Sequence, residues 1–192
     1  MAVLLVEQDL SLDAAGLTSG LVDLAVFEIG GRSVLYALSR SENLLIELER
    51  ASDGALSIAN ALALTGTFAA GSDPSVDHVV LGNGASVLTL AGLSEADGQA
   101  VTLGADGTLG TQIALSGVGT LAAAQSLDLS GTEGMLSGGA EGGLNLFTGA
   151  GAGFGWTASL PDTADRYLSD VTDLLTFTIG AQTFVGTVST SE

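Results

Sequence analysis

The residues best suited to chemistry in this chain are its single histidine and the aspartates beside it. His78 directly follows Asp77, and Asp73 lies just upstream. Histidine is the side chain whose ordinary pKa allows proton transfer near neutral pH. His78, Asp77 and Asp73 therefore form the candidate binding site, where His78 could act as a base. The alternative is a histidine that only packs and hydrogen-bonds within the fold.

Aspartates also recur along the chain at intervals of 54, 51 and 45 residues. The recurring positions are Asp23, Asp77, Asp128 and Asp173. A residue that returns in every unit of a repeat suits a structural task, such as bonding a neighbouring turn, better than a unique catalytic site. The residues that follow these aspartates are Leu24, His78, Leu129 and Leu174, so His78 replaces an apolar residue.

Several kinds of active site are excluded by composition. The sequence has no cysteine and no lysine, which removes thiolate, P-loop and Schiff-base chemistry, and one histidine cannot build a multi-histidine metal site. The glycine-rich residues 149–155 lack the dinucleotide spacing because Phe154 stands where a glycine belongs. We therefore expect no catalytic residue and no cofactor, and whether the chain is an enzyme stays open, with the balance toward a non-enzyme.

Calcium is the one metal for which the sequence contains a partial binding motif. Residues 138–146 resemble a single copy of the calcium-binding nonapeptide of parallel β-rolls, but Gly143 occupies the place of the aspartate ligand. One defective copy cannot assemble a site from stacked turns. We predict no built metal site, and loose binding of calcium by acidic loops is the alternative.

The charge balance restricts the partners. The chain of 192 residues carries 22 acidic side chains against four basic ones, a formal charge of −18. Such a surface repels phosphate backbones and anionic membranes. The uncharged stretch of residues 54–71 contains too many polar residues for a membrane span. We expect no nucleic-acid partner and no membrane insertion.

The candidate site residues lie within a sequence repeat, and the fold of that repeat must position them. Residues 20–42 match residues 170–192 without a gap at an offset of 150, with Asp23 over Asp173 and Phe27 over Phe177. Smaller matches divide the chain into units that start near residues 22, 76, 127 and 172. The fourth unit ends at Glu192, before the counterpart of Leu44–Leu48. Residues 1–19 are expected to form an N-terminal strand and lead-in, and residues 20–192 the repeats.

Each unit has the content of a small antiparallel sheet. Short apolar runs alternate with Gly-containing breaks, and Asp53-Gly54, Asn83-Gly84 and Asp106-Gly107 favour hairpins. Residues 60–70 and 121–127 are compatible with short helices, or with linkers or strands between units. Four strands in about 50 residues is the size of a propeller blade. We predict an all-β fold of consecutive four-stranded antiparallel blades, a partial β-propeller of about three and a half blades.

The residues Gly31–Arg40, Asn43–Leu48 and Asp53–Leu56 resemble one blade of the lactonase-type, 6-phosphogluconolactonase-like propellers with their YVTN-like or WD40-like repeats. They also resemble propeller segments at the front of acidic RTX-type bacterial exoproteins. The second resemblance implies a non-enzymatic binding or scaffold module of a larger, exported, calcium-associated protein. The first implies a hydrolase with its site at the central channel, and no catalytic residue of that family is carried over.

Localisation and partners follow from the same features. The N-terminus has no basic region, and its apolar run stops at Glu7, so we expect no N-terminal signal peptide. The resemblance to RTX-type exoproteins implies secretion by a route that needs none, for example type I secretion. A cytoplasmic location is the alternative. Because the fourth unit stops early, we expect either missing blades supplied by further sequence or self-association. The ligand is not identified by any motif.

Overall fold

The fold is known from a computed structural model. It describes residues 20–68, 70, 74–80, 85–94, 98–115, 121–129, 132–139, 143–148, 155–169 and 171–189. The N-terminal strand expected within residues 1–19 lies outside this part. Every regular element in the described part of the chain is a β-strand, which confirms the all-β class. Across these residues, no helix is long and apolar enough to cross a membrane.

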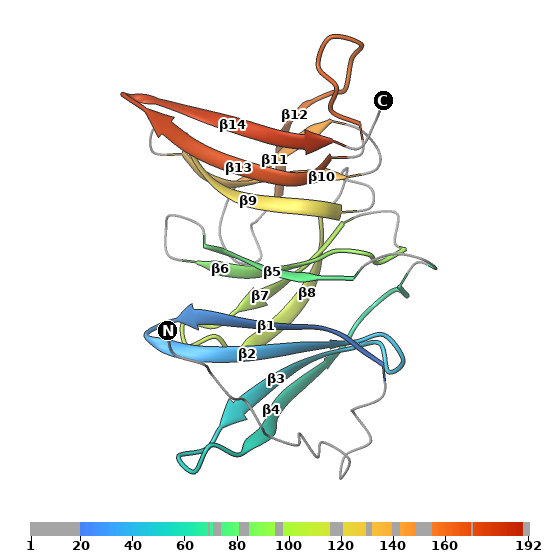
Figure 1. The fold of residues 1–192 in the computed structure, drawn as a ribbon, viewed down its shortest axis with the longest axis vertical. Coiled ribbons are helices and arrows are strands. Elements are labelled where there is room, and N and C mark those ends of the chain that lie inside the picture. Colours follow the sequence, from blue (N-terminus) through green and yellow to red (C-terminus); the bar gives the residue numbers. More distant parts are fainter. Residues whose placement is uncertain are drawn as a thin grey trace, which may run out of the picture.

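The strands form four antiparallel sheets in chain order, seen stacked in Figure 1. Sheet 1 contains β1 (Leu21–Ile29), β2 (Arg32–Ser39), β3 (Leu44–Arg50) and β4 (Leu56–Ala63). Sheet 2 contains β5 (Val76–Val80), β6 (Ser86–Leu90), β7 (Gly98–Leu103) and β8 (Leu109–Leu115). Sheet 3 contains β9 (Leu121–Leu129), β10 (Thr132–Gly139), β11 (Leu144–Thr148) and β12 (Gly155–Leu160). Sheet 4 contains β13 (Val171–Ile179) and β14 (Gln182–Ser189).

Two of the expected hairpins have the local chemistry that the sequence indicates. Asp53-Gly54 joins β3 to β4, with Gly54 at a φ of 90°, and the Asp53 carboxylate accepts a hydrogen bond from the Ala55 N–H at 2.9 Å. Asp106-Gly107 joins β7 to β8 in the same way, with Gly107 at a φ of 87°. The Asn83-Gly84 turn lies outside the described residues, although the flanking β5 and β6 pair antiparallel.

The third sheet departs from the expected register. Its lead strand β9 begins at Leu121, ahead of residue 127, and the segment 121–127 is strand rather than helix. Residues 60–63 are likewise the end of β4. The bulge near the start of β1 recurs near the start of β9, where Ala123 has the pairing position that Asp23 has in β1. Asp128 lies instead near the far end of β9, so it is not a lead aspartate. The weak third copy in the sequence concealed this shift.

The core lies between successive sheets. The largest cluster joins sheet 1 to sheet 2 and includes the fully buried Tyr36, Leu45, Leu88 and Val101. A second cluster joins sheet 2 to sheet 3 through Val79 and Phe147, and a third joins sheet 3 to sheet 4 around Val171. Packing of β1 on β5, β5 on β9 and β9 on β13 keeps the first strands of the sheets together. The apolar faces that meet at each joint are therefore buried against the neighbouring sheet, and Ala37, Ile46 and Leu48 form a further buried cluster on the other side of sheet 1.

Candidate functional site: the lead strands and the β14 groove

Asp23 links sheet 1 to sheet 2. It follows the bulge at the start of β1, and its Oδ1 accepts a hydrogen bond from the Leu24 N–H at 2.8 Å. Its Oδ2 accepts a second bond, also 2.8 Å, from the N–H of Val76, the first residue of β5. The carboxylate therefore satisfies a backbone donor of the next sheet, which holds the two lead strands in register.

Asp173 occupies the same place in sheet 4. The β13 strand has the same bulge, and Asp173 Oδ1 accepts a hydrogen bond from the Leu174 N–H at 2.8 Å. Asp77 stands at the second residue of β5. Three of the four recurring aspartates thus mark the beginnings of lead strands, and Asp128 does not.

The three lead aspartates gather at one end of the lead strands. Desolvation raises the pKa of the Asp77 carboxyl, and the charges of Asp23 and Asp173 raise it further. Asp77 and Asp173 are exposed and Asp23 is half-buried, so the carboxylates stay in contact with water. Within the residues that the structure describes, no three acidic or imidazole groups come close enough to hold a metal ion.

His78 lies between sheets 1 and 2. Its ring packs against Phe27 with centroids 5.3 Å apart. The Nε2 atom is buried and has no hydrogen-bond partner within the described residues, and burial lowers the pKa of His78. Asp73 lies outside the described residues, so only Asp77 and His78 of the predicted trio are placed. They are sequence neighbours on a strand and point to opposite faces of sheet 2.

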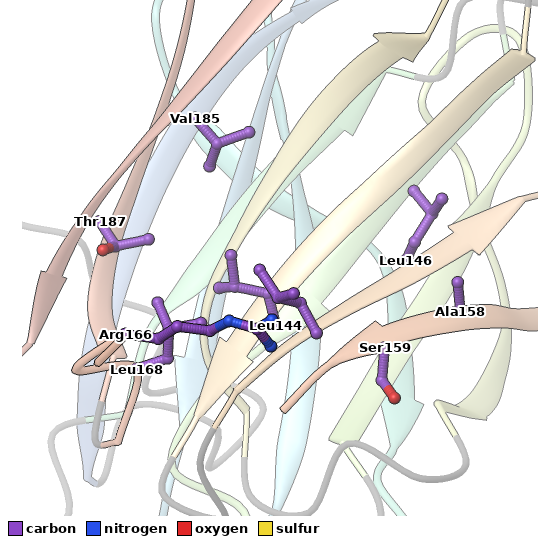
Figure 2. A pocket seen from close by; sticks show the side chains of 9 residues that line it. Leu144, Leu146, Ala158, Ser159, Arg166, Leu168, Val185 and Thr187 are labelled. Atoms are coloured by element: carbon purple, nitrogen blue, oxygen red, sulfur yellow. The ribbon is translucent and has the colours of Figure 1, made fainter. Parts of the chain in front are cut away.

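A groove beside β14 was not predicted from the sequence. It encloses about 470 Å³ between the outer half of sheet 3 and the β13–β14 hairpin, and Figure 2 shows the side chains around it. We call it the β14 groove. Its lining residues are Leu144, Leu146, Ala158, Ser159, Leu160, Arg166, Leu168, Val185 and Thr187.

Within the described residues, sheet 4 has two strands where sheets 1 to 3 have four, and the groove lies beside this narrower sheet. β13 packs against β9 and β10, which leaves the β11–β12 part of sheet 3 without a facing strand. Arg166 stands at the mouth and donates a hydrogen bond to the Pro161 carbonyl at 3.3 Å. The sequence pattern predicted two strands for the fourth unit, but not which side chains would line the groove.

Comparison with known proteins supports the architecture. No protein-family model and no curated protein matches the sequence. The crystal structure of BBS1N in complex with ARL6DN, soaked with mercury, aligns with 87% of this chain at a TM-score of 0.52 and 13% sequence identity. The chain spans 47% of that BBS1N chain, which is a β-propeller. The likeness shows a β-propeller-like fold for the stacked sheets.

Proposed function

We propose that this chain is a non-enzymatic, propeller-like binding module that takes an extended segment of a partner protein along β14. The observation that carries the proposal is the β14 groove, an apolar channel beside a strand that, among the described residues, pairs only with β13. An unpaired strand edge with adjacent side-chain pockets is the usual setting for binding by β-strand addition.

The lining indicates what the segment looks like. Val185 and Thr187 project from β14 into the groove, opposite Leu146 and Leu160, so the segment needs apolar side chains at alternate positions. Arg166 is one of only four basic residues in the chain, and it favours an acidic side chain at one end of the segment. The solved relative is itself in complex with a protein, ARL6DN, which is compatible with a protein partner here.

The repeat supplies a probe. β14 corresponds to β2 at the offset of 150, and β3 pairs beside β2 in sheet 1. A labelled peptide that copies residues 41–50 (SENLLIELER) should therefore bind beside β14, as measured by fluorescence anisotropy. A scrambled peptide should not bind.

Two valine variants make the peptide test specific. Val185→Asp places a charge in the groove and should weaken peptide binding at least tenfold, because burying an unpaired charge costs several kcal/mol. Val80→Asp is the matched control at another exposed valine, and it should leave binding unchanged. Equal binding by both variants, or no saturable binding of the peptide, would remove the proposal.

The alternative function is a lactonase-like hydrolase. The unpartnered, buried Nε2 of His78 is the observation in its favour. Against it, the ring packs on Phe27, and no hydrogen bond joins its Nε2 to a nucleophile or a second base among the described residues. We expect no hydrolysis of a simple lactone above background and no stoichiometric metal in the purified chain. Lactone turnover that disappears in His78→Ala would establish the hydrolase instead.

We extend the proposal to the wider setting that the sequence resemblance implies. The module would belong to a larger exported RTX-type protein in a calcium-rich environment, where divalent cations screen its acidic surface. Millimolar calcium should then raise the melting temperature more than magnesium does. Equal effects of the two cations would point to charge screening alone and would remove the calcium-specific part of the proposal.

A further inference from the structure

One face of sheet 4 is an apolar surface without a partner. Leu175, Phe177 and Ile179 alternate along β13 and are 60%, 42% and 63% exposed. Phe184 of β14 stacks on Phe177 with ring centroids 5.5 Å apart. We call these four residues the trailing face. They point away from sheet 3, since the preceding Leu174 is on the other face of β13 and packs into the core shared with sheet 3.

The trailing face of sheet 4 corresponds to the face of sheet 1 that packs against sheet 2. At the offset of 150, its residues correspond to Ala25, Phe27, Ile29 and Val34 of sheet 1. Those residues belong to, or pack against, the cluster that joins sheet 1 to sheet 2. Sheet 4 therefore carries the same apolar pattern that sheet 1 uses to receive the next sheet.

The surface that would receive the trailing face is on sheet 1, at the other end of the stack of sheets. Sheet 2 presents His78 to Phe27 of sheet 1. Matching Asp77 with Asp23 makes Leu24 the counterpart of His78 and Val26 the counterpart of Val80. Leu24 and Val26 are 53% and 62% exposed. We call these two residues the leading face.

The extents of the two faces also agree. On the Leu24 side of sheet 1, Ala37, Ile46 and Leu48 of β2 and β3 are buried, and the exposed apolar residues are on the lead strand β1. The open part of this side is narrow. Sheet 4 has two strands, so its trailing face is narrow in the same way and lies on the corresponding inner strands.

We propose that the trailing face of one chain docks on the leading face of a second copy, so that Phe177 packs on Leu24 as Phe27 packs on His78. Asp173 would then offer its second oxygen to the Val22 N–H of the second copy, as Asp23 does to Val76. Two chains of four sheets make a head-to-tail ring with two identical joints. Eight sheets lie within the size range of closed propellers, and closure gives a twofold-symmetric dimer.

Sedimentation velocity of three single variants tests the joint. Wild-type chain at micromolar concentration should sediment as a dimer. Leu24→Arg and Phe177→Asp should each shift the population to monomer, because each places a charge in both apolar joints of the dimer. Tyr167→Asp is the control. Tyr167 is 66% exposed, lies off both faces, and has a φ of 51° that aspartate tolerates.

Mixing the two disruptive variants separates a broken joint from a broken fold. In a mixed dimer, one joint is wild-type, and the other sets the introduced arginine of one chain against the introduced aspartate of its partner. An equimolar mixture should therefore recover dimers that neither variant forms alone. Peptide binding in the β14 groove should persist in both monomers, since the groove lies on the opposite side of sheet 4. A compact wild-type monomer, dimers unaffected by Leu24→Arg, or an open series of larger species would each overturn the closed head-to-tail dimer.

Discussion

His78 carries an energetic cost that its counterparts avoid. The ring packs on Phe27 while its Nε2 is buried without a hydrogen-bond partner among the described residues, in a position where the other lead strands have apolar side chains. Leaving a buried polar atom unpaired costs about 1–3 kcal/mol. We predict that His78→Leu raises the free energy of unfolding by roughly 1 kcal/mol near neutral pH, as measured by urea denaturation.

The same residue gives stability a defined pH dependence. Because burial lowers the pKa of His78 in the folded chain, the unfolded state binds a proton first as the pH falls below about 6.5. Wild-type stability should therefore decline from about pH 6.5 downward through the folded pKa, and the gain from His78→Leu should grow over that window. A pH-independent difference between the two proteins would show that the imidazole finds a partner.

The ionisation of Asp77 has the opposite effect on the pH dependence of stability. Desolvation and the charges of Asp23 and Asp173 raise its pKa in the folded chain. The unfolded state therefore favours the ionised form, and this penalty appears as the pH rises above the ordinary aspartate pKa of about 3.9. Asp77→Asn should stabilise the chain at neutral pH and make no difference below about pH 3.5. Stabilisation at both pH values, in paired urea titrations, would assign the gain to something other than charge.

At the scale of the elements, the joint between sheets 1 and 2 depends on a close approach of sheet 1 side chains to the backbone of Gly107. The Tyr36 hydroxyl donates a hydrogen bond to the Gly107 carbonyl, and a Cβ on Gly107 would lie 2.8 Å from Val34 Cγ2. Asp106 shapes this turn by accepting bonds from Thr108, which lower the pKa of its carboxyl. The buried Glu47 carboxylate also accepts a hydrogen bond from the Leu109 N–H at 3.2 Å.

Two glycine substitutions separate this close approach from backbone strain. Gly107 and Gly31 have φ values of 87° and 77°, but nothing lies within 4 Å of a Cβ built on Gly31. Gly31→Ala should cost about 1–2 kcal/mol for the left-handed conformation alone. Gly107→Ala should cost a further 1–3 kcal/mol, roughly, for the overpacked joint. Equal losses in thermal or urea unfolding would mean that the joint relaxes at no cost.

Sequence reasoning worked at this scale where a local rule decides the structure. Asp-Gly pairs at residues 53–54 and 106–107 fixed two hairpins because glycine accepts a positive φ. It failed in sheet 3, where the lead position is Ala123 and Asp128 only resembles the repeated aspartate. Pairing register is set by the partner strand, so no single-strand pattern reveals it. The β14 groove escaped prediction for a related reason, since its walls come from segments of sheets 3 and 4 that are not adjacent in sequence.

For the whole molecule, the same strong acidity from which we expect no nucleic-acid partner also opposes compaction. The formal charge of −18 is distributed over 192 residues with only four basic side chains. The ion pair between Arg32 and Asp106, with 3.8 Å between nitrogen and oxygen, is exposed. Such a pair contributes at most about 1 kcal/mol. The stacked sheets are therefore held by apolar burial and backbone pairing against their own electrostatic repulsion.

Salt should stabilise both the folded chain and the proposed dimer. Raising the ionic strength from about 0.01 M to about 1 M shortens the screening length from roughly 30 Å to 3 Å, which removes repulsion between sheets and between chains but leaves apolar contacts intact. We predict that sodium chloride raises the unfolding midpoint in urea at a protein concentration too low for association, and that it also tightens the dimer. Asp165→Asn with Glu49→Gln, both at exposed residues, should flatten the salt dependence of the midpoint by lowering the net charge. Weaker association at high salt would mean that ion pairs, and not the leading and trailing faces, hold two copies together.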